Sequence, residues 1–147
     1  SDRCSASKQN WRVTDDNNHK LEATLKIERY PDSNVVGDPK VIIGQVHGYE
    51  IKQALIKLLW EGENKPVRAI LNNTYLPNNQ QCSHCKSFSI NLGTVKAGTN
   101  WQYKIEVNDE GIVLAAAGVE KSFSWGTSIE KTGYTLDPSW ASDSNSF

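Results

Sequence analysis

The chain has 147 residues, of which 16 are basic and 17 acidic, and its formal net charge is −1. This length supports a single domain, residues 1–147, around one sizeable core, and the charge balance gives no electrostatic basis for binding nucleic acid. The sequence contains no run of about 18 apolar residues, so we expect no membrane-spanning helix.

Apolar and polar residues alternate in the first predicted strand, residues 20–28. Leu21, Ala23, Leu25 and Ile27 fall on one face, which is the pattern of a strand with one buried side. Turn-forming residues flank this segment on both sides, at 17–18 and 31–34.

The second predicted strand, residues 41–47, lies in the segment 41–48, which reads Val-Ile-Ile-Gly-Gln-Val-His-Gly. Side chains two positions apart on a strand share a face, so Gln45 and His47 lie side by side, about 7 Å apart along the chain. An amide and an imidazole on an otherwise apolar strand cost free energy unless they have partners. Two interpretations remain open: a functional site, or a buried polar pair satisfied by neighbouring strands.

Residues 54–60 are predicted to form a third strand. Ile56, Leu58 and Trp60 alternate with Leu55, Lys57 and Leu59. A helix of about two turns is the alternative, but no N-cap residue precedes it, so the pattern favours a strand. The alternation does not decide whether Lys57 faces a ligand or bulk solvent.

Further strands are predicted at 67–71, 88–92, 101–107, 112–116 and 122–125, with a hairpin turn at Glu110-Gly111. Strands that recur every 10–15 residues or so with turns between them indicate an all-β sandwich, jelly roll or barrel. Residues 137–147 read as a polar loop, and His19 and His84 as solvated turn residues.

The three cysteines are Cys4, Cys82 and Cys85. The Cys-Ser-His-Cys segment at 82–85 admits a short-loop disulfide, a redox dithiol or half of a zinc site. No second ligand pair for zinc is visible and no βαβ setting for a redox motif, so we favour a Cys82–Cys85 disulfide. Cys4 is then either a free thiol or paired with a cysteine outside these residues. Residues 15–18 lack the spaced ligands of a calcium loop, so we expect a turn there and no metal site.

The segment Gln45-Val46-His47 resembles the Gln-(Ile/Val)-His motif of alginate lyases in polysaccharide lyase families 7 and 18. Residues 18–26, 56–62, 101–107 and 134–140 also match those enzymes in order and spacing. The resemblance implies an all-β antiparallel jelly roll of two sheets, with a substrate groove along the concave sheet. It also implies a secreted lyase that acts on alginate, an acidic polysaccharide, without a metal or organic cofactor.

The chemistry of alginate suits these two side chains. Cleavage by β-elimination removes the proton at C5, next to a carboxylate whose charge opposes the developing carbanion. A hydrogen-bond donor such as Gln45 stabilises that carboxylate as charge develops. His47 is suited to act as the base near neutral pH, or it acts on the carboxylate while a tyrosine handles the proton.

Two strands of those lyases are missing from this sequence: an Arg-Ser/Thr-Glu-Leu-Arg strand and a Tyr-Phe-Lys-Ala-Gly-x-Tyr strand. They carry the family's arginine contacts and its catalytic tyrosine. The chain also lacks methionine and has an odd number of cysteines. We therefore expect an incomplete catalytic domain, with the remaining segments elsewhere in the same protein or in another chain.

A second class of function stays open at this point. Sandwich folds also serve as non-catalytic carbohydrate-binding modules, so the fold alone does not decide between a lyase and a binding protein. A Cys-x-x-Cys oxidoreductase is a more distant third, since it needs a reactive, low-pKa thiol.

Overall fold

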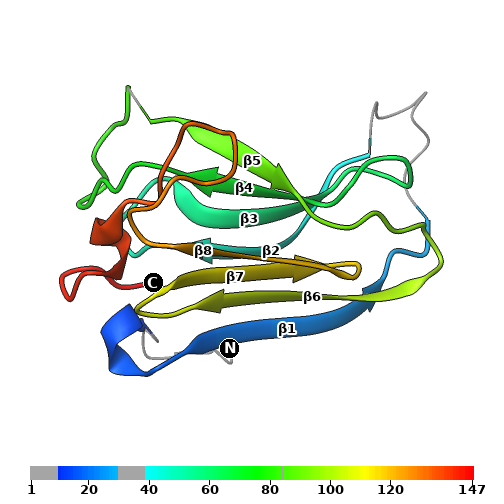
Figure 1. The fold of residues 1–147 in the computed structure, drawn as a ribbon, viewed down its shortest axis with the longest axis horizontal. Helices are drawn as coiled ribbons and strands as arrows, with labels where there is room; N and C mark the ends of the chain where they lie inside the picture. Colours follow the sequence, from blue (N-terminus) through cyan, green and yellow to red (C-terminus); the bar gives the residue numbers. More distant parts are fainter. Residues whose placement is uncertain (1–9, 30–38, 84) are drawn as a thin grey trace, which may run out of the picture.

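Two four-stranded antiparallel sheets make up the computed structural model, which describes residues 10–29, 39–83 and 85–147 (Figure 1). The first sheet has the order β1 (His19–Lys26), β6 (Asn100–Val107), β7 (Gly111–Ala116), β8 (Val119–Ser124). The second has the order β2 (Val41–His47), β3 (Ala54–Trp60), β4 (Arg68–Asn72), β5 (Ser87–Asn91). Two short 3-10 turns, η1 (Val13–Asp15) and η2 (Pro138–Ala141), lie outside the sheets. The all-β, two-sheet architecture expected from the sequence is confirmed.

Chain neighbours pair within each sheet. β2 to β5 follow one another as a meander, as do β6 to β8, and β1 joins the free side of β6. The turn between β6 and β7 is held by Asn108, whose Oδ1 accepts from the backbone N–H groups of Glu110 (2.9 Å) and Gly111 (3.0 Å). Among the described residues, no helix is long and apolar enough to cross a membrane.

The core lies between the two sheets. In β6 the inward residues are Trp101, Tyr103, Ile105 and Val107, and β3 contributes Ile56, Leu58 and Trp60; all are buried. Residues 137–147 form no strand, as expected of a loop, but they contain the 3-10 turn η2 and are not only polar surface: Trp140 is fully buried and Phe147 is 9% exposed. Apolar side chains spaced widely along a polar segment carry no periodic signal, yet they fill one end of the core.

The sandwich is open along one side. In the described chain, β2 pairs only with β3 and β1 pairs only with β6. Between these two edges lies a cleft of about 420 Å³, lined by residues of both strands and by the core residues Ile105 and Val107. Leu21, which faces this opening, is 43% exposed although it pairs with the buried Ile105.

The backbone of β2 approaches the opposite sheet closely at Gly44. A Cβ atom there would lie 2.9 Å from Cε2 of Tyr103. Register shifts against β3 occur between Ile42 and Gly44 and again between Val46 and His47. These irregularities bracket Gln45 and set which face of the sheet it occupies.

Candidate active site

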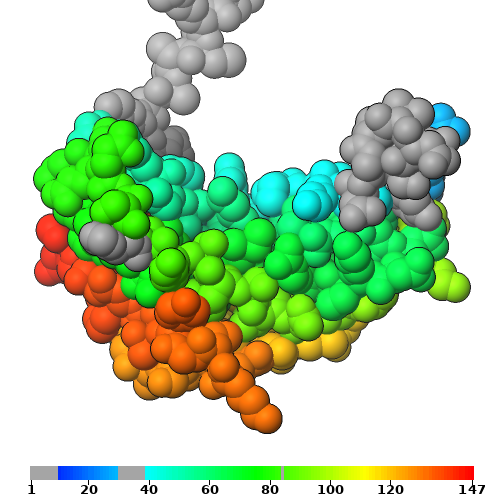
Figure 2. All heavy atoms as spheres, turned by 90° about the horizontal axis from the view of Figure 1, so that it is seen from above, coloured from blue at the N-terminus to red at the C-terminus, as the bar shows by residue number. Residues whose placement is uncertain are grey.

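The outer face of the β2–β5 sheet is the candidate site. In Figure 2 the molecular outline dips over the cyan to green residues of this sheet, while the yellow and orange strands form the opposite side. Cross-strand pairing places side chains on this face in rows. One row runs Ile42, Leu59, Arg68, Asn91, and the next runs Gln45, Lys57, Ile70, Ser89.

Gln45 and His47 both belong to this outer face. Val46 between them is 9% exposed and packs into the core, whereas the side chains of Gln45 and His47 are exposed. The alternation follows the pleat of β2. The two groups are therefore open to a ligand on the hollowed side, and the interpretation of a buried polar pair does not apply to them.

His47 is held in a defined tautomer by its neighbour. Its Nδ1 lies 2.9 Å from the carbonyl oxygen of Gly48. A carbonyl oxygen only accepts hydrogen bonds, so in the neutral ring Nδ1 carries the proton and Nε2 keeps a lone pair. The side chain of Gln45 makes no hydrogen bond to any described residue, which leaves its amide N–H groups available to a ligand.

On the same face, the positive charge of Arg68 is neutralised by the carboxylate of Glu61. Its Nε and Nη2 donate to the Glu61 carboxylate at 2.9 and 3.0 Å, and its Nη1 donates to Ser89 at 3.2 Å. Glu61 is nearly buried, and the hydrogen bonds from Arg68 lower the pKa of its carboxyl group below the usual value. The sequence carried no signal for this pair, because its members lie in different segments, seven positions apart, with no regular element linking them.

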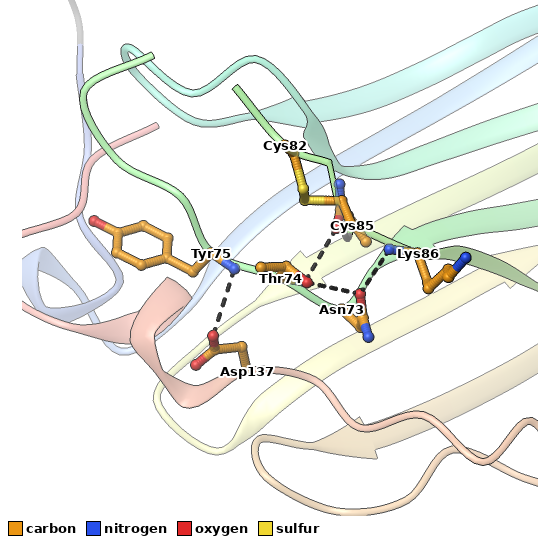
Figure 3. The surroundings of a disulfide bond; sticks show 8 residues. Asn73, Thr74, Tyr75, Cys82, Cys85, Lys86 and Asp137 are labelled. Carbon is orange, nitrogen blue, oxygen red and sulfur yellow. Dashed lines mark hydrogen bonds between the residues drawn. A yellow bond between two sulfur atoms is a disulfide. The ribbon is translucent and has the colours of Figure 1, made fainter. Parts of the chain in front are cut away.

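The loop between β4 and β5 borders the His47 end of the face. Asn79 N–H donates to the carbonyl of Glu50 at 2.6 Å, which ties this loop to the turn after β2. At the base of the loop, the Oδ1 of Asn73 accepts from Lys86 N–H and from the Thr74 hydroxyl (Figure 3). Cys82 and Cys85 form the predicted disulfide in this loop. The expectations for Cys4 and His84 lie outside the described residues.

A larger cleft, about 580 Å³, lies on the other sheet and has the wrong charge for an acidic polymer. Its lining includes Glu22, Lys104 and Glu120. Lys104 donates to Glu120 at 2.6 Å, and this hydrogen bond raises the pKa of Lys104. Two carboxylates against one paired ammonium repel a polyanion, so this cleft does not suit the acidic polysaccharide that the resemblance of the sequence implies.

His19 differs from expectation. It begins β1, is half-buried and stacks on Trp11, with ring centroids 4.2 Å apart. A solvated turn was expected because residues 15–18 are turn formers, but the strand begins one residue earlier than the apolar alternation indicated. Within residues 10–29, 39–83 and 85–147 no group of three or more potential metal ligands comes together.

A family model described as alginate lyase matches residues 2–147, nearly the whole chain. No curated protein matches the chain.

Proposed function

This chain belongs to the alginate lyase family, and from that premise we propose that Gln45 and His47 act together in β-elimination. The protein is a polysaccharide lyase, and an acidic polysaccharide is the substrate of its family. The observation that carries the proposal is the placement, side by side on the hollowed face, of an imidazole and an amide that no described side chain or backbone group binds.

The step balances as follows. Nε2 of His47 takes the C5 proton, and the electron pair of the C5–H bond becomes the C4–C5 double bond. The C4–O4 bond breaks, and O4 leaves with its electron pair and takes up a proton. The amide of Gln45 donates to the C5 carboxylate, where negative charge accumulates in the transition state.

The tautomer of His47 favours a role as the base that removes the C5 proton over a role as hydrogen-bond donor to the substrate carboxylate. A neutral imidazole with its proton on Nδ1 presents only a lone pair at Nε2, so it accepts a proton and does not donate to a carboxylate. The complementary role then falls to Gln45. No residue of this chain is assigned to protonate O4; the resemblance attributes that step to a tyrosine on a strand that this sequence lacks.

The reaction type is tested by following two products during incubation with alginate. Elimination creates one conjugated double bond and one reducing end for each cleavage. The number of double bonds, measured by ultraviolet absorbance, is therefore expected to equal the number of new reducing ends. Reducing ends without absorbance would indicate a hydrolase. Binding of alginate with neither signal would indicate a carbohydrate-binding module and would refute the proposal.

We also propose that further polypeptide segments of the protein complete the sheet beside β2. Three features support this: the edge of β2 that no described strand pairs with, the exposed Leu21, and the cleft that reaches the core residues Ile105 and Val107. A strand there would satisfy the outward-pointing backbone groups of β2 and cover apolar surface. It would also bring new side chains next to Gln45 and His47.

Hydrogen exchange of the complete protein tests this completion. The β2 amides that point toward β3 are protected in either case and serve as the internal control. The amides that point away from β3 are expected to exchange as slowly as those of a central strand. Exchange at the rate of open, solvated backbone would show that the edge stays free.

Secretion belongs to the same proposal. The Cys82–Cys85 disulfide supports it, because disulfides form and persist in oxidising compartments outside the cytosol. A polysaccharide substrate also lies outside the cell, so an enzyme that degrades it acts there most directly. Detection of the protein only in the cytosolic fraction of its source would contradict this assignment.

A further inference from the structure

Lys57 stands directly across from Gln45 on the hollowed face. The two residues are cross-strand partners in the β2–β3 ladder, and side chains so paired have Cβ atoms roughly 5 Å apart. Lys57 is the one exposed side chain of β3; its neighbours on the same face, Leu55 and Leu59, are buried. The ammonium group therefore rises from an apolar floor beside the proposed catalytic pair.

The charge of Lys57 is uncompensated within the described chain. Strands β2 to β5 contain two cationic residues, Lys57 and Arg68. Arg68 is paired with Glu61, whereas Lys57 makes no ion pair with any described residue. Of the cations on these strands, Lys57 is thus the one available to an anionic ligand.

The geometry points to Lys57 as a substrate-binding residue that binds a second carboxylate of the substrate, on a sugar adjacent to the one that loses its C5 proton. This inference rests on the proposed function, which places Gln45 at the reacting carboxylate. In a polymer of uronic acids every sugar carries a carboxylate, so a groove that holds several sugars meets several negative charges. An ammonium one strand away from Gln45 is placed to meet the next one.

The role predicts a particular kinetic signature. A contact to a non-reacting sugar is equally strong in the ground state and the transition state, so its loss raises KM and leaves kcat nearly unchanged. We expect Lys57→Met, which keeps the length of the side chain and removes its charge, to raise KM for alginate about tenfold. The change in kcat is expected to stay within about twofold. Lys57→Arg keeps the charge and is expected to retain most of the affinity.

A matched control is available on the other side of the molecule. Lys131 is exposed and lies in the loop after β8. The orange segment that follows β8 lies on the side of the molecule opposite the hollow (Figure 2). Lys131→Met makes the same change in net charge, and we expect it to leave KM unchanged. If both variants raise KM equally, the effect is one of overall charge and the assignment of Lys57 is wrong. It is also wrong if Lys57→Met leaves KM unchanged, or if it lowers kcat by a hundredfold or more.

A binding measurement separates this inference from the proposed function. In a His47→Ala background, which blocks the proposed chemistry, calorimetric titration with an alginate oligosaccharide reports affinity alone. The additional Lys57→Met change is expected to weaken binding about tenfold, with less dependence on salt. Unchanged affinity and unchanged salt dependence would overturn the role of Lys57, whatever the reaction assay shows.

Discussion

Replacing His47 with alanine is expected to lower kcat on alginate by about 10²- to 10⁴-fold, the range that removal of a general base produces. The exposed imidazole contributes little to folding, so its loss removes chemistry and leaves the sandwich intact. Initial rates of double-bond formation measure the effect. The thermal midpoint of unfolding should stay within a few degrees of the wild-type value, since substitutions of exposed residues change stability only slightly.

Chemical rescue of the His47→Ala protein distinguishes two roles of His47, as the base or as the partner of the substrate carboxylate. Imidazole added to the His47→Ala protein fills the space left by the side chain and can accept the C5 proton. Partial recovery of the rate, growing with the concentration of unprotonated imidazole, is the expected result. A His47→Ala protein that turns over at the wild-type rate would exclude His47 from the reaction.

The substitution Gln45→Glu is expected to have an effect of similar size. It keeps the shape of the side chain, removes both N–H donors and places a negative charge beside the C5 carboxylate. Loss of one preorganised donor to a developing anion typically costs about 10²- to 10³-fold in kcat, and the added repulsion also weakens substrate binding. Steady-state kinetics on alginate measure both parameters.

The variant Gln45→Leu separates the two causes. It removes the donors without adding charge, so kcat is expected to fall by about 10²-fold while KM changes much less. The same loss of kcat in both variants would assign the effect to the missing hydrogen bond. A loss of less than about threefold in Gln45→Leu would remove Gln45 from the mechanism.

Most of the fold could be predicted from the alternation of side chains. The strand at 41–47 and the strand at 54–60 begin and end where the pattern placed them, and β6 buries the four residues expected to face inward. Pairing between strands could not be predicted, because β1 joins β6 across about eighty residues and no local signal encodes that contact. The burial of Trp140 likewise depends on tertiary contact and follows no local alternation.

The site was predictable only in part. The period of two placed Gln45 and His47 on one face, and their exposure agrees with it. The orientation of Lys57 could not be predicted, because β3 is apolar on both faces and either phase suits a strand in a sandwich. It follows from the register with β2, which includes two shifts that no sequence pattern reveals. The Arg68–Glu61 pair likewise depends on tertiary contact.

The close approach of Gly44 to Tyr103 links the candidate site to the far layer of the molecule. The phenol ring occupies the space that any β-carbon at position 44 would need, so the height of the strand beneath Gln45 is set from the opposite side of the protein. Engineering that enlarges position 44 must therefore shrink position 103 at the same time.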